Sequence, residues 1–245
     1  MLFDMETLEA QSRYKILTAT VTPRPIAWVT TLSEDGVINA APYSFFNVLG
    51  HEPPTLALGL LAGKGRFKDT ATNVLATGEF VVNLVSEANA AAMNVTCIDA
   101  PPEIDELELA GLTPVRSHAV KPPRIAQSPV SFECRVLTSM VTGPRQTIVI
   151  GRILCAHVGD AFVQDKERCY IDTEGLGLIG RMHGSGWYAR CTSWIGRTGR
   201  TGSATAMQQN SSQVARHDRC DNSCPSNRHY SSCHAGVPRI MVQVA

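Results

Sequence analysis

Short apolar runs separated by turn residues dominate the first part of the chain and predict strands. Residues 26–32 are largely apolar and β-branched, which is typical of a buried strand. Residues 33–36, Ser-Glu-Asp-Gly, supply turn chemistry, because Asp-Gly tolerates the positive φ that a hairpin needs. The chain returns through residues 37–41, so the pattern predicts a pair of antiparallel strands.

Similar patterns continue through the middle of the chain. Residues 79–86 predict a strand, and residues 87–95, which are rich in alanine, predict a helix. Residues 146–158 form a long strand pattern that ends at Gly159-Asp160, a hairpin signal. These runs predict a mainly β domain with a few helices.

The residues that follow the first predicted hairpin are unusual for a core strand. Residues 42–47, Pro-Tyr-Ser-Phe-Phe-Asn, mix small, hydroxyl, aromatic and amide side chains. A backbone run of this kind could line a flat aromatic ring. The alternative is an ordinary hairpin that binds no ligand.

A second polar segment, residues 63–73, precedes a short predicted helix that stops at Gly78. Asp69 or Thr70 can cap this helix. The Gly-Lys-Gly-Arg sequence before it leaves the backbone free to approach a ligand closely. We therefore expect the amino terminus of the helix to be open to a ligand.

The chemistry of this segment suits a phosphate. A helix amino terminus offers unpaired N–H groups and the positive end of the helix dipole. Arg66 and Lys68 would add charge, and Thr70 and Asn73 would add neutral donors. The alternative interpretation is a solvated basic turn before a capped helix.

Together the two segments resemble the opening motifs of the flavin reductase-like family, which carries FMN on a split β-barrel. In that family a PRPIA strand and a G-x-x-N-x-A-P-x-S-x-F-N segment lie beside the isoalloxazine ring. An R-x-K-D-T-x-x-N segment follows and holds the FMN phosphate. This sequence matches with Pro23-Arg24-Pro25-Ile26-Ala27, then Gly36, Asn39, Ala41, Pro42, Ser44, Phe46 and Asn47, and then Arg66, Lys68, Asp69, Thr70 and Asn73.

The resemblance implies a mainly β split barrel with a few peripheral helices, and a set of FMN contacts. Backbone N–H groups of residues 44–47 would lie near N5 and the carbonyl edge of the ring. They would stabilise negative charge on the reduced flavin and so raise its reduction potential. The candidate FMN-binding residues are Arg24, Thr30, Thr31, Ala41, Pro42, Ser44, Phe45, Phe46, Asn47, Arg66, Lys68, Asp69, Thr70 and Asn73.

Three of these candidates have a second interpretation. Thr30 and Thr31 are candidates for contacts with the ribityl hydroxyls, but threonine in a strand is also simply a good β-former. Arg24 is a candidate for the ring or phosphate edge, but beside two prolines it is equally a candidate for a surface residue.

The function implied by the resemblance is an FMN-dependent oxidoreductase of flavin reductase type, acting as a homodimer. It would move hydride from NAD(P)H to flavin or another small acceptor. Because the sequence shows no acid, base or nucleophile constellation, a non-catalytic FMN carrier or electron-transfer flavoprotein stays open, as does a scaffold without cofactor. His183, Trp187 and Tyr188 are candidates for a lid over the ring or for a subunit contact, and Trp187 is equally a candidate for a core residue.

Composition narrows the function classes further. The chain has 245 residues, 44% of them hydrophobic, and no formal net charge, so no broad attraction to nucleic acid or anionic lipid is implied. Residues 1–15 lack the apolar stretch of a secretory signal. No run approaches the roughly 18 apolar residues of a membrane span, so we expect a cytoplasmic protein.

Composition changes abruptly near residue 192, which predicts two regions, 8–191 and 192–245. In the second, serine, arginine, cysteine and histidine accumulate and apolar periodicity disappears, as in chains that cannot bury a core. Either a disordered extension or a shifted reading frame after about Arg190 would account for it. Cys220, Cys224 and Cys233 lie near histidines, but their spacing fits no standard zinc site.

One further motif is discounted. Residues 175–180 satisfy G-x-G-x-x-G, but glycines follow where the helix of a dinucleotide-binding fold should run. We therefore expect no separate nucleotide-binding domain. Reduced nicotinamide would bind in the exposed groove over the flavin, as in the family that the sequence resembles.

Overall fold

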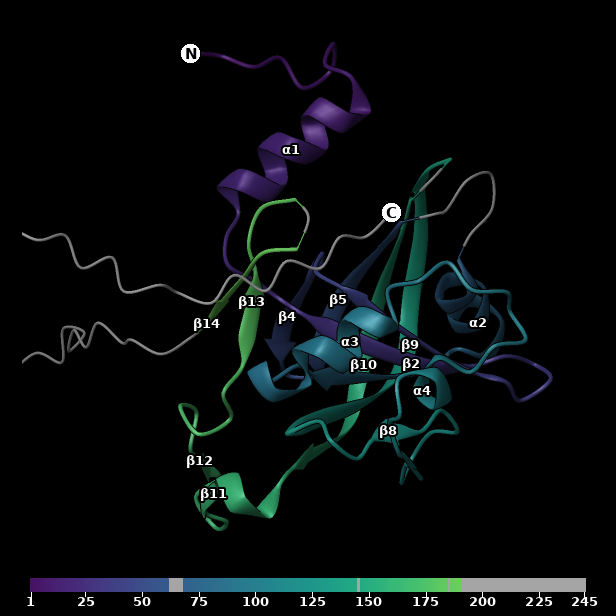
Figure 1. Ribbon diagram of the computed structural model, residues 1–245, viewed down its shortest axis with the longest axis vertical. Coiled ribbons are helices and arrows are strands. Elements are labelled where there is room, and N and C mark those ends of the chain that lie inside the picture. Colours follow the sequence, from purple (N-terminus) through teal and green to yellow (C-terminus); the bar gives the residue numbers. More distant parts are fainter. Residues whose placement is uncertain (62–67, 145, 185, 191–245) are drawn as a thin grey trace, which may run out of the picture. The chain divides into compact units, whose positions relative to one another are not determined.

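The computed structural model describes residues 1–61, 68–144, 146–184 and 186–190 (Figure 1). All the described residues belong to one compact unit, Met1–Thr192. Among these residues no helix has the length and apolar character that crossing a bilayer requires. The segment with Cys220, Cys224 and Cys233 lies outside the described residues.

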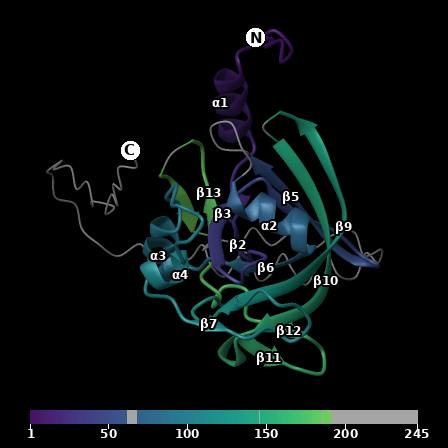
Figure 2. The same cartoon turned by 90° about the vertical axis from the view of Figure 1, so that its right-hand side faces the viewer.

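A seven-stranded antiparallel sheet forms the body of the described unit. Its longest strands, β9 and β10, form one hairpin with several register shifts, and Figure 2 shows how strongly both strands curve. In spatial order the strands are β3 (Ile38–Tyr43), β2 (Ala27–Leu32), β6 (Glu79–Leu84), β9 (Val130–Gly143), β10 (Gln146–Val158), β5 (Pro54–Leu61) and β4 (Phe46–His51).

Smaller elements surround this sheet. Helix α1 projects away from it (Figures 1 and 2), whereas α2 packs on β2 and β3, and α4 packs on β3. The helices are α1 (Ala10–Thr20), α2 (Asp69–Thr77), α3 (Ala90–Val95) and α4 (Glu106–Leu109), and the short strand groups are β1 (Arg24–Pro25) with β13 (Ile179–Arg181) and β14 (Tyr188–Arg190), β7 (Pro114–Val115) with β8 (Arg124–Ile125), and β11 (Val163–Asp165) with β12 (Tyr170–Ile171). The prediction of a mainly β fold with a few helices is confirmed.

Strand β2 is buried on both faces, which explains why its sequence is a continuous apolar run. Val29 joins a cluster between the sheet strands that includes Phe80. Trp28 points the other way into a cluster with residues of α3 and α4. The indole N–H of Trp28 donates to Thr96 Oγ1 at 2.9 Å, so its one polar atom is satisfied inside this second cluster.

Most of the elements expected from the sequence are present. The strands predicted over residues 26–32, 79–86 and 146–158 form, and the helix predicted over 87–95 begins as a 3₁₀ turn before α3. The hairpin predicted at Gly159-Asp160 is wrong, because the chain enters a 3₁₀ turn there and β11 pairs with β12 instead of β10. The glycine-rich residues 175–180 lead into β13 and not into a helix.

A buried carboxylate ties the loop before β8 to the main sheet. Glu133 of β9 is fully buried and accepts hydrogen bonds from the backbone N–H groups of His118 at 2.7 Å and Ala119 at 2.5 Å. Its carboxylate also lies 2.6 Å from Nε2 of His157. Burial acts to raise the pKa of Glu133, but the two backbone donors and His157 together lower it below its ordinary value.

The first prediction concerns the acid stability that Glu133 provides. Since its folded-state pKa lies below the unfolded value of about 4.3, its contribution is present above that pH and is lost as pH falls through the folded pKa. Glu133→Gln should lower the free energy of unfolding at pH 7 by about 2–3 kcal/mol. Urea unfolding between pH 7 and pH 3 should show the difference from wild type shrinking with acid. The exposed Glu103→Gln is the matched control, and a difference that stays constant with pH would contradict the prediction.

Candidate functional site

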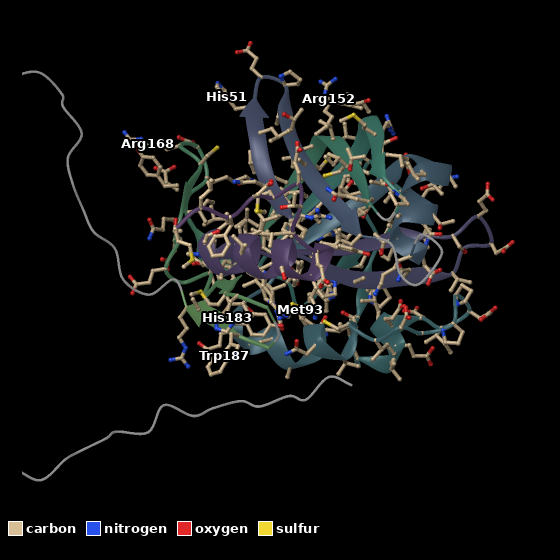
Figure 3. All side chains as sticks on the ribbon, turned by 90° about the horizontal axis from the view of Figure 1, so that it is seen from above. His51, Met93, Arg152, Arg168, His183 and Trp187 are labelled. Carbon is tan, nitrogen blue, oxygen red and sulfur yellow. The ribbon has the colours of Figure 1, made fainter. Side chains whose placement is uncertain are left out.

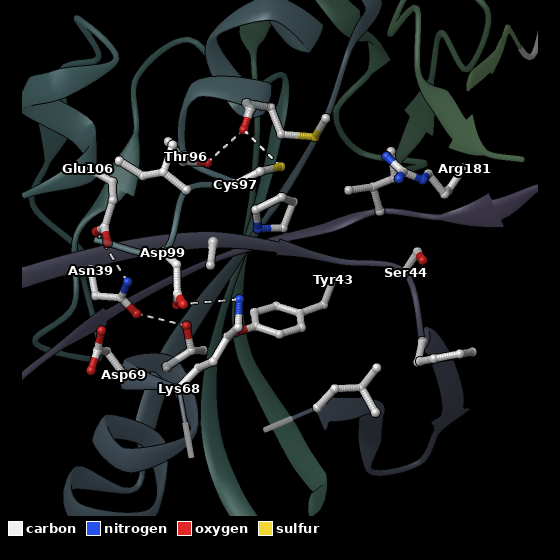
Figure 4. Close-up of a pocket in the computed structure, with 18 of the residues that line it drawn as sticks. Asn39, Tyr43, Ser44, Lys68, Asp69, Thr96, Cys97, Asp99, Glu106 and Arg181 are labelled. Atoms are coloured by element: carbon white, nitrogen blue, oxygen red, sulfur yellow. Dashed lines mark hydrogen bonds and ion pairs between the residues drawn. The ribbon is translucent and has the colours of Figure 1, made fainter. Parts of the chain in front are cut away.

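A cavity of about 270 Å³ lies where β3, α2, α3, α4 and the late strands β13 and β14 come together (Figure 4). One wall is the end of β3 and the segment after it, and a second is the first turn of α2. The rest of the lining comes from the end of α3 and the residues after it, from Gly59 and Leu61 of β5, from Ile26, and from single side chains of α1, α4, β13 and β14. Segments far apart in the sequence therefore face one space.

The β3 wall carries Ala41, Pro42, Tyr43, Ser44 and Phe45. It is held against β5 by the backbone, because the N–H of Gly59 donates to the carbonyl of Phe45 at 2.7 Å. A Cβ at position 59 would lie 2.9 Å from Cβ of Phe45, so only glycine allows this approach.

The α2 wall presents a helix amino terminus to the cavity. Lys68, Asp69 and Thr70 line it, and Lys68 is the N-cap residue but makes no side-chain capping bond. The prediction that Asp69 or Thr70 caps the helix is wrong, because both lie inside its first turn. The first-turn N–H groups thus lack a capping side chain. The helix ends at Gly78, as predicted, and this glycine lies in the left-handed region with φ of 70°.

Lys68 of this wall forms an ion pair with Asp99, which also lines the cavity. Nζ of Lys68 lies 3.9 Å from Oδ1 of Asp99 (Figure 4), and the two side chains are 41% and 86% exposed. Such a solvated pair contributes less than about 1 kcal/mol, so a competing anion can replace Asp99 at low cost.

A buried polar network forms the floor between β3, α2 and α4. The hydroxyl of Thr70 donates to Oδ1 of Asn39 at 2.7 Å, and Nδ2 of Asn39 donates to Oε2 of Glu106 at 3.2 Å. The backbone N–H of Ala40 donates to the same carboxylate oxygen at 3.0 Å. Asn39 and Glu106 therefore fix the first turn of α2 against β3.

Tyr43 and Cys97 are neutral groups of the cavity lining that have raised pKa values. Burial raises the pKa of Tyr43 to about 12, so its phenol keeps its proton and remains a donor at physiological pH. Burial likewise raises the pKa of the Cys97 thiol, which therefore stays protonated and a weak nucleophile.

Arg24 lies behind the cavity and holds its segments together. Its guanidinium donates to the carbonyls of Thr18, Val21 and Met182, each at 2.8 Å, and Nε donates to Oγ of Ser44 at 3.3 Å. It is only 4% exposed, and burial lowers its pKa. The surface interpretation of Arg24 is therefore wrong, since the side chain joins the end of α1, the segment after β3 and the segment after β13.

The candidate residues divide into three groups by position. Those that line the cavity are Ala41, Pro42, Ser44, Phe45, Lys68, Asp69 and Thr70, whereas Arg24, Thr30, Thr31, Phe46, Asn47 and Asn73 lie outside its lining, and Arg66 lies outside the described residues.

The candidates outside the lining have internal roles instead. The hydroxyl of Thr30 donates to the carbonyl of Pro123 at 2.5 Å, and Nδ2 of Asn73 donates to the hydroxyl of Thr31 at 3.0 Å. Phe46 belongs to the hydrophobic core. The side-chain oxygen of Asn47 accepts a hydrogen bond from the next backbone N–H at 2.9 Å.

Of the candidates His183, Trp187 and Tyr188, only Tyr188 lines the cavity. The hydroxyl of Tyr188 accepts from Arg181 at 2.6 Å and donates to Oδ1 of Asn94 at 2.7 Å. His183 and Trp187 lie together outside the lining (Figure 3), with ring centroids 5.8 Å apart. Trp187 is 52% exposed, so the core interpretation of this residue is wrong.

Several cavity residues were missed by sequence reasoning. Tyr14, Asp99, Glu106 and Arg181 reach the cavity from α1, the residues after α3, α4 and β13. No short-range pattern links them to the two motifs; Asn39 and Glu106, for example, are bonded across 67 positions of sequence. Tyr43 was also not named as a candidate, although its place inside the first motif, between Pro42 and Ser44, is a signal that could have identified it.

The second prediction tests Arg24 as the residue that joins these segments. Arg24→Lys should lower the free energy of unfolding by about 2–3 kcal/mol, because one ammonium cannot reach all of the partners that the planar guanidinium spans. Trypsin should also cleave faster at Arg13 or Lys15 of α1. Urea unfolding and timed proteolysis measure both effects, with the exposed Arg152→Lys as control (Figure 3). Unchanged stability and cleavage would refute the assignment.

Comparison with known proteins gives a consistent result. Residues 19–173 match the model of the flavin reductase like domain. An uncharacterized protein of Deinococcus radiodurans is 42% identical over 202 residues, covering 80% of this chain and 88% of the relative. The crystal structure of nitrilotriacetate monooxygenase component B from Bacillus cereus superposes with a TM-score of 0.75 at 33% identity, covering 80% of this chain and 98% of that one.

A third similarity bears on the fold alone. A protein from Shewanella frigidimarina, described as a flavin reductase with a split barrel domain, superposes with a TM-score of 0.69 at 20% identity, over 82% of this chain and 100% of the other. The seven-stranded curved sheet is thus the split barrel that the sequence predicted.

Proposed function

Since this chain belongs to the flavin reductase-like family, we propose that it is an FMN-dependent oxidoreductase of flavin reductase type. It moves hydride from NAD(P)H to flavin or another small acceptor. One observation carries the proposal: the cavity joins the two motif segments, the end of β3 with residues 41–45 and the first turn of α2 with residues 68–70.

The residues present suit FMN. Uncapped N–H groups of α2 and the ammonium of Lys68 are the donor set that binds a phosphate. Tyr43, Ser44 and Phe45 offer apolar and neutral polar surface for the ring. We place the phosphate at α2 and the ring along the β3 wall. When bound, the flavin supplies the hydride chemistry, and this chain supplies position and a shielded, hydrogen-bonding environment.

The remaining parts of the proposal concern the reductant and the assembly. Reduced nicotinamide binds over the ring on the side of Arg181 and Tyr188, where Asn94 holds the tyrosine hydroxyl in place. The protein acts as a homodimer in the cytoplasm. The raised pKa values of Tyr43 and Cys97 keep both groups protonated, so neither would act as a base toward the bound flavin.

Anaerobic mixing of the FMN-loaded protein with NADH or NADPH tests this function. Rapid bleaching of the visible flavin band is the expected result. Retained FMN without bleaching would make the protein a carrier, and a protein that takes up no FMN would overturn the assignment altogether.

The third prediction tests the phosphate position. Lys68→Ala should weaken FMN binding about tenfold, or about 1.4 kcal/mol, and should leave riboflavin binding nearly unchanged, because only FMN carries the phosphate. Fluorescence titration measures both constants, and the exposed Lys166→Ala on the β11–β12 turn is the matched control. Equal losses for the two ligands would show that the phosphate lies elsewhere.

The fourth prediction concerns the partner of that lysine. Asp99→Asn should tighten FMN binding by about twofold to fivefold, since the exposed pair contributes less than about 1 kcal/mol and its loss frees Lys68 for the phosphate. The same titration measures the change. Weaker FMN binding in this variant would mean that Asp99 positions Lys68 and does not compete with the ligand.

A further inference from the structure

We propose that Glu106 is a specificity-determining residue of the cavity, whose outward oxygen accepts a hydrogen bond from a hydroxyl of the ligand's polyol chain. The inference rests on the proposed function, and it names the part of the ligand that this residue selects. Glu106 would favour flavins that carry the ribityl chain over the bare ring.

The first support is the way in which Glu106 is held. It is 4% exposed and lies in the first turn of α4, next to Asp105, whose side chain caps that helix. Its Oε2 is occupied by two donors of β3, Nδ2 of Asn39 and the N–H of Ala40. The carboxylate is therefore fixed in orientation before any ligand arrives.

The second support is the state of the other oxygen. Within the described residues, Oε1 of Glu106 has no hydrogen-bond partner and Glu106 has no ion pair. The fully enclosed side-chain atoms without partners in that part of the chain are Nε of Arg124 and Oγ1 of Thr147, so Oε1 is not sealed inside the protein. Glu106 lines the cavity, and its bonded oxygen is turned toward Asn39 (Figure 4), so we infer that Oε1 is the oxygen open to the cavity.

The third support is the chemistry that such an oxygen requires. Neither of the basic residues that the structure describes in the cavity lining pairs with Glu106. Lys68 pairs with Asp99, and Arg181 donates to the hydroxyl of Tyr188 and the carbonyl of Gly184. A ligand that covers this oxygen without offering a donor would leave a carboxylate oxygen unsatisfied, which is costly, and the carboxylate repels anions. A neutral O–H or N–H donor satisfies it with a charge-assisted hydrogen bond.

The position of Glu106 relative to the proposed phosphate site indicates which group of the ligand would donate to Oε1. Through Asn39, Glu106 is linked to the hydroxyl of Thr70 in the first turn of α2, where we place the phosphate. In FMN the groups that adjoin the phosphate are the ribityl hydroxyls, whereas the donors of the ring lie at the far end of the molecule. A polyol hydroxyl is thus the ligand group that reaches Glu106.

Glu106→Gln gives a sharp test, because the amide oxygen can keep both bonds to β3 while an N–H₂ donor replaces the acceptor that faces the cavity. We expect riboflavin and FMN to bind about tenfold or more weakly and lumiflavin, which has a methyl group in place of the ribityl chain, to bind as in wild type. Fluorescence titration measures all three constants. Glu108→Gln, an identical change on the exposed side of α4, is the matched control and should alter none of them.

The outcomes separate this inference from the proposed function. Wild type that binds no flavin would overturn both. If wild type binds flavin, then unchanged riboflavin binding in Glu106→Gln, or an equal loss for lumiflavin, overturns the role of Glu106 alone. A change confined to the apparent KM for NADH would overturn it too, because the donor would then belong to the nicotinamide.

A measurement on wild type keeps the inference testable if the variant does not fold. Riboflavin analogues that lack the 2′, 3′ or 4′ hydroxyl are titrated in turn. Removal of one particular hydroxyl should weaken binding about tenfold, and removal of the others should have a clearly smaller effect. Three equal, small losses would contradict a single fixed acceptor.

Discussion

The cavity depends on the two hydrogen bonds that the buried side-chain amide of Asn39 makes to Thr70 and Glu106. Its oxygen accepts from Thr70 of α2, and its nitrogen donates to Glu106 of α4, while its backbone belongs to β3. Three elements from different parts of the chain therefore meet at one side chain. Because a buried donor or acceptor without a partner is costly, these elements cannot shift independently. The amino terminus of α2 is thereby held at a constant distance from the β3 wall.

Arg24 performs the same task at another place beside the cavity, where it contacts Ser44 of the lining. It is bonded to carbonyls at the end of α1 and after β13 and to the hydroxyl of Ser44. The Asn39 network and Arg24 hold different parts of the site. The Asn39 network fixes the amino terminus of α2, where the anionic end of a ligand would lie. Arg24 fixes the segment after β3, which carries Ser44 and Phe45. Rigid positioning of both parts is what a site needs when its cofactor carries the chemistry.

Sequence reasoning predicted the elements and the two walls that depend on local patterns. The strand over residues 26–32 was recognisable because it is buried on both faces, and the β3 and α2 walls were recognisable because each is a contiguous motif. It failed where the answer depends on distant partners. Thr30 and Thr31 are polar residues in a strand near a motif, but Pro123, Asn73 and Asn39 satisfy them internally. Glu106 gave no signal, because its role arises only when α4 packs on β3.

The arrangement of charge in the cavity explains how one small space can suit both ends of a ligand such as FMN. Its described basic residues, Lys68 and Arg181, are outnumbered by Asp69, Asp99 and Glu106, so net charge does not favour an anionic ligand. Selectivity must therefore come from the order in which the polar groups follow one another along the cavity wall. The α2 amino terminus favours an anion. The fixed carboxylate beside it repels a second anion and favours neutral donors. A ligand in which a phosphate is followed by hydroxyls and then by a flat ring meets these preferences in sequence, whereas one with adjacent anionic groups does not.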